Sequence, residues 1–174
     1  AQRMCLMIKR FFDLLLSFVG ILALAPVLLI VAIAVKCSSR GPVLYTQKRS
    51  GLHGSIFSVY KFRTMVDRAE TLGTSVTTQA DPRVTSLGRF LRRTKLDELP
   101  QLFNVLKGDM SFVGPRPDVP EIVAKYTPEI KKILSVRPGI TSLATLHFRD
   151  EEVLLSKAEN PDRFYEKILV PFKV

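Results

Sequence analysis

The pattern of hydrophobic and polar positions begins with one long apolar run. It covers Phe11–Val35, 25 residues whose apolar character is broken only by Asp13, Ser17, Gly20 and Pro26. As a single straight helix the run would be about 37 Å long, which exceeds the roughly 30 Å thickness of a membrane's hydrocarbon core. The pattern therefore predicts a membrane helix within the first 40 residues.

Pro26 and the flanking charges argue against a simple span. Proline has no N–H to donate and clashes with the preceding turn, so we expect halves of about 22 and 15 Å, each too short to cross. Basic residues lie on both sides of the run, and basic flanks favour the cytoplasmic side. They are Arg3, Lys9 and Arg10 before it, and Lys36, Arg40, Lys48 and Arg49 after it.

We therefore expect a re-entrant helix that breaks at Ala25-Pro26. A kinked spanning helix and a cleaved signal peptide are the alternatives. Asp13 could pair with Arg10 at the water boundary.

Beyond the apolar run, two short segments have the composition of strands. They are residues 43–49 and 56–63, and the Gly- and Ser-containing segment Ser50–Ser55 between them has the chemistry of a turn. The pattern predicts a β-hairpin. Lys61 and Arg63 are two positions apart in the second strand, so their side chains are expected on the same face.

The rest of the chain has mainly helical patterns. The predicted helices are Leu87–Arg93, Leu96–Leu106, Pro120–Leu134, Asp150–Lys157 and Pro161–Ile168. The second of them would carry Asp97 and Glu98 in its first turn and end at Gly108. These elements predict an α+β fold, mostly helical with a small β-hairpin. We divide it into residues 1–40, the membrane segment, and residues 41–174.

Charge and composition narrow the function. The chain carries a net charge of +10, and Lys36 to Arg116 contains 14 basic and 6 acidic residues. Such an excess attracts phosphates, so an anion site is expected in this half. Two cysteines and two distant histidines exclude a disulfide framework or a zinc centre built from these residue types. No Walker loop or dinucleotide fingerprint is present, and the basic residues lack the interleaved aromatics of a nucleic-acid surface.

The candidate chemistry centres on Asp97-Glu98. Four cations precede the pair within nine positions: Arg89, Arg92, Arg93 and Lys95. We expect these cations and a helix N-terminus to keep Asp97 ionised, because opposite charge lowers the pKa of a carboxyl group. An ionised carboxylate can attack phosphorus, and adjacent acids can hold Mg²⁺. The alternative is structural, since acids are favoured in a first helical turn.

Several motifs together lead to a family. They are Gly41-Pro42-Val43, Gln47–Gly51, Lys61–Met65, Leu91–Gln101, Gly114-Pro115-Arg116-Pro117 and Arg137–Thr141. With the Pro-broken apolar run, they make the chain resemble the monotopic phosphoglycosyl transferases from about Lys9 to its C-terminus. These bacterial sugar transferases start glycan assembly on polyprenyl phosphate. The Asp-Glu-Leu-Pro-Gln core with Gly-Pro-Arg-Pro downstream is the most specific part of the match.

The resemblance implies roles for individual residues. Asp97 would be the nucleophile that attacks the β-phosphorus of a UDP-sugar, releases UMP and carries the phosphosugar. Glu98 would help hold Mg²⁺ and activate the lipid phosphate. The cations that would contact phosphate, nucleotide or sugar are Lys61, Arg63, Arg92, Arg116, Arg137 and Arg149.

The resemblance also implies partners and a location. The enzyme would transfer sugar-1-phosphate from a UDP-sugar to polyprenyl phosphate, for exopolysaccharide or other glycoconjugates. It would lie among membrane lipids at the cytoplasmic face of the bacterial inner membrane, with residues 41–174 as its catalytic domain. Nucleic acid is not an expected partner, and a homodimer is allowed. Two rival hypotheses are a non-catalytic basic module that docks on anionic lipid, and direct transfer without a covalent intermediate.

The sequence departs from the family's pattern at three places. Ala25 precedes Pro26 where members usually have Ser, and Ser142 stands where Gly is common. Members also tend to continue beyond a position like Val174, and this chain begins with Ala1. We therefore expect a trimmed form of a longer chain.

Overall fold

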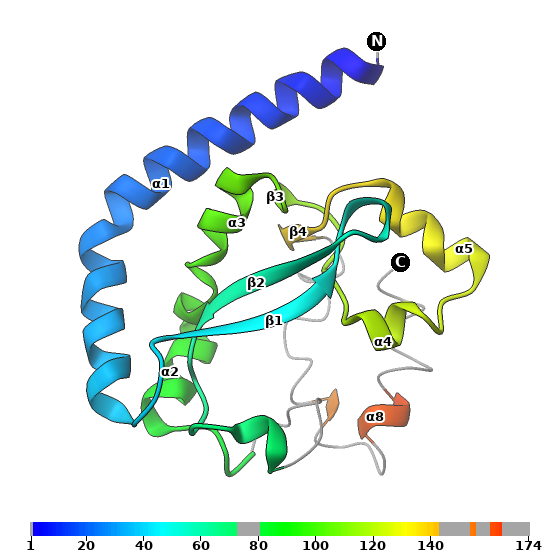
Figure 1. The fold of residues 1–174 in the computed structure, drawn as a ribbon. Helices are drawn as coiled ribbons and strands as arrows, with labels where there is room; N and C mark the ends of the chain where they lie inside the picture. The colour runs from blue at the N-terminus through cyan, green and yellow to red at the C-terminus, as the bar shows by residue number, and fades with distance from the viewer. Residues whose placement is uncertain (1, 73–80, 143–153, 156–160, 165–174) are drawn as a thin grey trace.

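The computed structural model describes residues 2–72, 81–142, 154–155 and 161–164 (Figure 1). Its helices are α1 Gln2–Ser38, α2 Ser86–Thr94, α3 Gln101–Lys107, α4 Pro120–Val123, α5 Pro128–Lys131 and α8 Pro161–Phe164. Short 3₁₀ turns are η1 Leu52–Gly54, η2 Ala69–Thr71, η3 Leu96–Glu98 and η4 Lys132–Ser135. The strands are β1 Leu44–Ser50, β2 Ile56–Phe62, β3 Ser111–Val113 and β4 Gly139–Thr141. Within these residues the fold is α+β, as expected.

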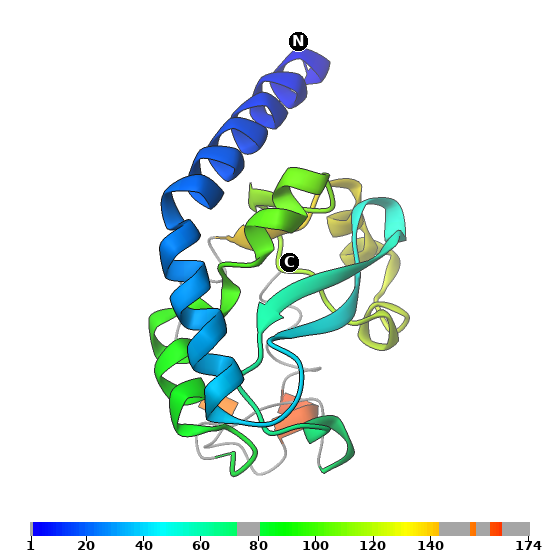
Figure 2. The same cartoon turned by 60° about the vertical axis from the view of Figure 1, so that its left-hand side comes forward.

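Helix α1 is continuous, which corrects the predicted division at Ala25-Pro26. Pro26 lies inside the helix, and Figures 1 and 2 show α1 bending part-way along its length. A proline removes only the hydrogen bond to the residue four positions earlier, here Leu22, so the remaining bonds can carry the helix through a bend. The re-entrant topology stays a prediction.

One face of α1 packs on the protein and the rest is apolar and exposed. Val31 and Val35 are buried in a cluster with Phe62 and Leu91. By length and composition the Met4–Ser38 segment could cross a membrane, and only 11% of its most apolar window is buried, unlike a core helix. Its exposed large side chains include Met4, Leu6, Met7, Ile8, Phe11, Phe12, Leu15, Leu16, Phe18, Val19, Leu22, Leu29, Ile30 and Ile33. An apolar surface of this size points to membrane association.

The polar residues of α1 attach it to the rest of the protein. Asp13 is buried and accepts hydrogen bonds from the Ser111 hydroxyl at 2.8 Å and the Phe112 N–H at 3.2 Å. Its ion pair is with Lys9, at 3.4 Å, and not with Arg10 as predicted. Arg10 instead donates to the Val105 and Leu106 carbonyls at the end of α3. A helix C-terminus carries partial negative charge, so this carbonyl pair outcompetes Asp13 for the guanidinium.

The predicted hairpin is confirmed. Strands β1 and β2 are antiparallel, with Tyr45 opposite Lys61 and Arg49 opposite Phe57. The hairpin crosses the middle of the molecule, with α3 between it and part of α1 (Figure 1). Val59 of β2 packs against Val105 of α3 in the second apolar cluster.

Helix α2 approaches the end of β2 backbone to backbone. A Cβ at Gly88 would lie 1.9 Å from the Thr64 carbonyl oxygen, so only glycine fits. The Thr85 side chain caps the helix by accepting from the Gly88 N–H at 2.9 Å. The prediction of a helix over Leu87–Arg93 is confirmed.

Two predicted helices are interrupted. The Leu96–Leu106 helix is divided into η3 and α3, because Pro100 has no N–H to return to the Leu96 carbonyl. The Pro120–Leu134 helix is divided into α4, α5 and η4. Pro128 stands at the first position of α5, where a proline's missing N–H costs nothing, so the chain begins a new helix there. Of the last two predicted helices, α8 falls in the range 161–168, and most other positions lie outside the described residues.

Strands β3 and β4 form a parallel pair that the sequence pattern did not indicate. Ser111 pairs with Gly139 and Val113 with Thr141. The two backbones nearly touch where Gly114 meets Gly139, because a Cβ on Gly139 would lie 2.1 Å from the Gly114 nitrogen. This contact sets the starting point of the Gly114–Pro117 loop.

Candidate active site

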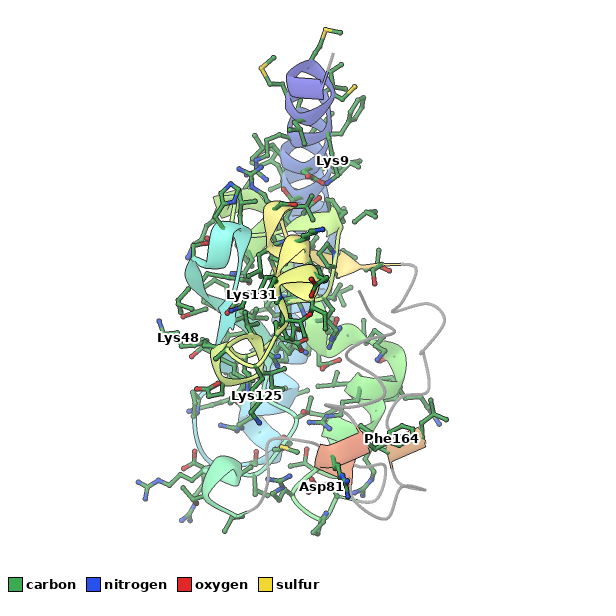
Figure 3. The ribbon with its side chains drawn as sticks, turned by 90° about the vertical axis from the view of Figure 1, so that its right-hand side faces the viewer. Lys9, Lys48, Asp81, Lys125, Lys131 and Phe164 are labelled. Carbon is green, nitrogen blue, oxygen red and sulfur yellow. The ribbon has the colours of Figure 1, made fainter. Side chains whose placement is uncertain are left out.

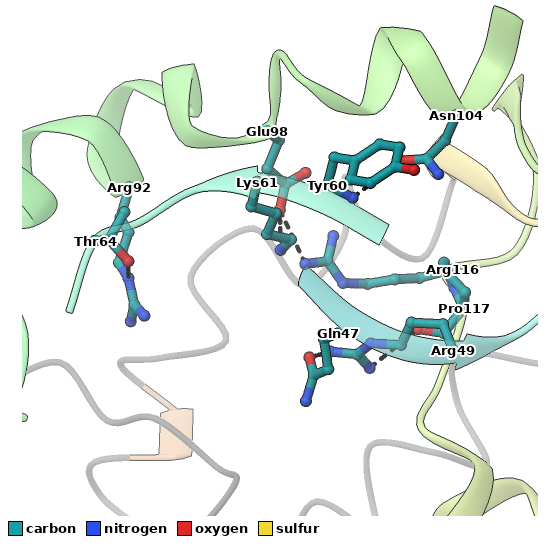
Figure 4. A network of polar contacts seen from close by, with 10 residues as sticks. All are labelled: Gln47, Arg49, Tyr60, Lys61, Thr64, Arg92, Glu98, Asn104, Arg116 and Pro117. Atoms are coloured by element: carbon teal, nitrogen blue, oxygen red, sulfur yellow. Dashed lines mark hydrogen bonds and ion pairs between the residues drawn. The ribbon is translucent and has the colours of Figure 1, made fainter. Parts of the chain in front are cut away.

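The centre of the site is Glu98, which accepts hydrogen bonds from two cations. Lys61 Nζ and Arg116 Nη2 each lie 3.0 Å from Glu98 Oε1 (Figure 4). The three side chains come from β2, η3 and the loop after β3. Packing of β2 against α3, and the parallel pairing of β3 with β4, bring these distant segments together.

The two cations determine the charge state of Glu98. Burial by itself would raise the pKa of the Glu98 carboxyl group, but the charges and hydrogen bonds of Arg116 and Lys61 outweigh it and hold this pKa well below its usual range. Burial, together with repulsion from Arg116, lowers the pKa of Lys61. Glu98 is therefore a carboxylate at neutral pH.

Asp97 lies in a different environment from its neighbour. It is 7% exposed, and its Oδ1 has no hydrogen-bond partner among the residues that the structure describes. Burial raises the pKa of Asp97, repulsion from Glu98 adds to this, and attraction to Lys61 and Arg92 opposes it. The predicted cations do act on Asp97, since Arg92 and Lys95 favour its ionised form, but burial outweighs them and leaves the Asp97 pKa raised. That Asp97 is ionised stays a prediction.

Arg92 and Arg63 have hydrogen-bond partners other than Glu98. Arg92 donates from Nε to the Thr64 hydroxyl at 2.9 Å, apart from Glu98 in Figure 4, and its charge still favours ionised Asp97. Arg63 is buried and donates to the Ser39 carbonyl at 2.7 Å and hydroxyl at 2.9 Å. Its partners thus differ from those of Lys61, which contacts Glu98, and the expectation that the two side chains share a face stays a prediction.

Of the two remaining predicted cations, only Arg137 belongs to the residues that the structure describes. Arg137 donates from Nε to the Gly108 carbonyl at 3.0 Å, where α3 ends, and so takes a structural position there. Arg149 lies outside the described residues. The structure therefore places Lys61 and Arg116 directly on the dyad, places Arg92 within electrostatic range of Asp97, and separates Arg63 and Arg137 from the Glu98 contacts.

Two polar residues on β1 were missed as site residues. Arg49 donates from Nη1 to the Pro117 carbonyl at 3.2 Å, and Gln47 accepts from Arg49 Nη2 at 2.6 Å. Both lie beside the Arg116 loop (Figure 4). The signal was present in the predicted hairpin, because alternate residues of a strand share a face, and the register places that face beside Lys61.

The dyad also has features that suit Mg²⁺. Asp97 and Glu98 are adjacent and offer two carboxylates, of which Asp97 is buried and Glu98 is ionised. Among the described residues no group of three or more His, Cys, Asp or Glu side chains gathers as a metal cage. Mg²⁺ is commonly held by one or two carboxylates with water and substrate phosphates completing its shell, so this donor set fits the ion.

The chain is similar in sequence to known bacterial proteins over most of its length. A family model described as bacterial sugar transferase matches residues 4–170. An undecaprenyl-phosphate glucose phosphotransferase of Komagataeibacter xylinus is 47% identical over 146 residues, which are 80% of this chain and 27% of that protein. A UDP-glucose:undecaprenyl-phosphate glucose-1-phosphate transferase of Escherichia coli is 43% identical over 162 residues, 91% of this chain and 35% of the relative.

A shorter relative matches over most of its own length. An exopolysaccharide production protein of Rhizobium leguminosarum is 45% identical over 150 residues, 82% of this chain and 75% of the relative. The chain thus spans about a third or less of the first two relatives and three quarters of the third.

Proposed function

This chain belongs to the bacterial sugar transferase family, and on that premise we propose that it transfers sugar-1-phosphate from a UDP-sugar to undecaprenyl phosphate. The observation that carries the proposal is that the two carboxylates of the dyad have different surroundings. Glu98 holds both contacting cations, while the Asp97 Oδ1 is without a hydrogen-bond partner among the described residues. A carboxylate oxygen that donates its lone pairs to nothing else is suited to attack phosphorus.

The first step of the proposed reaction forms a covalent intermediate. Asp97 Oδ1 attacks the β-phosphorus of the UDP-sugar, an Asp97–phosphorus bond forms, and the bond from phosphorus to the bridging oxygen breaks. UMP leaves with that oxygen, and the sugar phosphate stays on Asp97 as an acyl phosphate. Arg116 and Lys61 lie where they could stabilise the negative charge on the diphosphate oxygens.

The second step frees the enzyme. An oxygen of undecaprenyl phosphate attacks the phosphorus on Asp97, the acyl phosphate bond breaks, and the lipid diphosphate sugar leaves. Glu98 stays ionised at neutral pH, and because its pKa is held well below the usual range it is a weak proton acceptor. Its role would be to hold Lys61 and Arg116 where they can bind the lipid phosphate. The Asp97 and Glu98 carboxylates would hold Mg²⁺, and the bound ion would supply positive charge to the substrate's phosphate oxygens.

The decisive test of this function is product release. The purified chain in detergent is mixed with Mg²⁺, undecaprenyl phosphate and individual UDP-sugars, and UMP is measured. UMP release that depends on one or more UDP-sugars supports the proposal and identifies the sugar. A chain that binds anionic vesicles but releases no UMP from any UDP-sugar would instead favour the lipid-docking module.

Replacing Arg116 with lysine should slow turnover by at least about tenfold, equal to about 1.4 kcal/mol of activation free energy. Lysine keeps the charge but loses the planar fork that can hold two oxygens at once. The measurement is kcat for UMP release. The matched control is Arg68→Lys, the same replacement at an exposed arginine, which should leave kcat unchanged. Near-normal turnover of Arg116→Lys would relegate Arg116 to a structural role.

We further propose that α1 enters the cytoplasmic leaflet and returns, so that both its ends face the cytoplasm. The bend in α1 and the basic flanks support this. Cys5 and Cys37 are free, exposed and close to the two ends of α1. In spheroplasts an impermeant maleimide should label neither cysteine until the cells are lysed.

Two variants sharpen the topology experiment. Cys5→Ser and Cys37→Ser assign each signal to one end, and Pro26→Ala restores the missing N–H, straightens α1 and should raise labelling from outside. Labelling of Cys5 in intact wild-type spheroplasts would replace the re-entrant topology with a spanning helix.

A further inference from the structure

The loop that carries Arg116 is held by the hairpin on one side. Arg49 Nη1 donates to the Pro117 carbonyl at 3.2 Å, and the Ser50 N–H donates to the Asp118 carbonyl at 2.9 Å. These are the two positions directly after Arg116. The last two residues of β1 therefore hold the backbone of the loop directly after Arg116.

The parallel strand pair holds the same loop on the other side. The Gly139 N–H donates to the Pro115 carbonyl at 2.9 Å, and the Gly114 N–H donates to the Thr141 carbonyl at 3.0 Å. Arg116 thus lies between two anchored prolines whose rings restrict the backbone. With the Pro115 side tied to β4, the loop after Arg116 is held by the contacts at Pro117 and Asp118, and the one at Pro117 is nearest to Arg116.

The Arg49 side chain is itself oriented by a neighbour. Gln47 Oε1 accepts from Arg49 Nη2 at 2.6 Å, while Arg49 Nη1 donates to the Pro117 carbonyl (Figure 4). The two bonds use different nitrogens of one planar guanidinium, a geometry that a lysine ammonium cannot reproduce on both partners at once. Because Gln47 and Arg49 alternate along β1, strand pairing keeps them on one face.

We propose that Arg49 is a positioning residue that holds Arg116 in place on Glu98 through the Pro117 carbonyl. It acts on the reaction by way of Arg116 and not by contact with the substrate. The kinetic part of this inference rests on the proposed function, whereas the chain of contacts from Gln47 to Arg116 can be tested without any activity.

The kinetic test is a double-mutant cycle between Arg49 and Arg116. Arg49→Ala should lower kcat about tenfold, as expected for losing one charge-assisted hydrogen bond, and Arg49→Lys should lower it nearly as much. Arg116→Ala should cost at least as much, and the double variant should be no slower than Arg116→Ala alone. This non-additivity is expected when one residue acts only through the other.

The matched control is Lys48→Ala. It removes the same charge from the residue directly before Arg49 in β1. Lys48 is exposed and points away from the body of the protein (Figure 3). Its kcat should equal that of the wild type. A second variant, Gln47→Ala, keeps Arg49 but removes the hydrogen-bond acceptor that orients it. It should also lower kcat, by less than Arg49→Ala does.

A second readout reports on Arg116 without turnover. An arginine-specific dicarbonyl reagent modifies accessible guanidinium groups, and mass spectrometry measures its rate at Arg116. Arg49→Ala and Gln47→Ala should raise this rate, because Arg116 then leaves Glu98 more often, and Lys48→Ala should not. Circular dichroism measures whether each variant is folded. If Arg49→Ala does not fold, the modification rate of Gln47→Ala takes its place in the test.

Two results would overturn the inference. Additive losses in the cycle would mean that Arg49 acts independently of Arg116, as a direct substrate contact would. An unchanged modification rate at Arg116 in folded Arg49→Ala or Gln47→Ala would mean that the Pro117 contact does not hold it. If the wild type releases no UMP, the proposed function fails, and the modification rates still decide whether Arg49 positions Arg116.

Discussion

Asp97→Asn is expected to abolish sugar-phosphate transfer, with a loss of at least about 10³-fold in kcat, because an amide is a poor nucleophile toward phosphorus. The variant should still fold. Burial raises the pKa of Asp97, so this position tolerates a neutral side chain, and asparagine is neutral and of nearly the same shape. The loss would therefore report on chemistry and not on stability.

The covalent intermediate gives the same prediction a second readout. Wild-type chain mixed with Mg²⁺ and a UDP-sugar labelled at the β-phosphate, without lipid acceptor, should become labelled and release UMP. Undecaprenyl phosphate should discharge the label, and hydroxylamine should remove it, as it does from acyl phosphates. Asp97→Asn should take up no label.

The controls for this experiment are Asp67→Asn and Glu98→Gln. Asp67 is an exposed aspartate, so the same replacement there should leave labelling intact. Glu98→Gln removes the acceptor of both ion pairs and should lower turnover sharply. Label on Glu98 would exchange the two proposed roles, and turnover with sequential kinetics and no trapped label would favour direct transfer.

Gly88→Ala is expected to have the largest effect on stability, lowering the free energy of unfolding by about 3 kcal/mol or more. The added Cβ would lie 1.9 Å from the Thr64 carbonyl oxygen, a backbone atom that cannot rotate away. That carbonyl also accepts from the Thr85 N–H at 3.0 Å, so moving it would break the contact that seats α2 on β2.

Gly20→Ala is the matched control, since Gly20 is also inside a helix. Its Cβ would lie 3.6 Å from Leu102 Cδ1, an ordinary contact, so the better helix propensity of alanine should stabilise the protein by up to about 1 kcal/mol. Denaturant unfolding in mild detergent, followed by circular dichroism, measures both variants. Equal stability of Gly88→Ala and wild type would contradict the backbone contact.

Where the sequence pattern was misleading, the cause was a contact between distant residues. The cluster of cations just before Asp97 suggested that these cations would be the ones in contact with the dyad, although Arg92 and Lys95 act on Asp97 only through their charge. The contacting cations are instead Lys61 and Arg116, 37 and 18 positions from Glu98, and they contact Glu98. Proximity along the chain is a poor guide to ion pairing when strands and loops converge on one turn.

The same reason explains the positions of Arg63 and Arg137. Both stand in motifs that suggested phosphate contacts, and both donate to backbone carbonyls near helix ends, Ser39 after α1 and Gly108 after α3. A helix C-terminus presents unpaired carbonyls, so a nearby guanidinium finds partners there. The pattern of residue types does not say which helix end will be nearby.

The sequence by itself determined the apolar N-terminal helix, the hairpin, helix α2, and the family, through the Asp-Glu and Gly-Pro-Arg-Pro motifs. These depend on period, turn chemistry and motif spacing, which are properties of neighbouring residues. Only the tertiary structure decided that α1 continues through Pro26, that β3 pairs with β4, that Glu98 holds both contacting cations, and that Arg49 reaches Pro117. Each of these depends on packing between segments far apart in the chain, and local pattern carries no record of that packing.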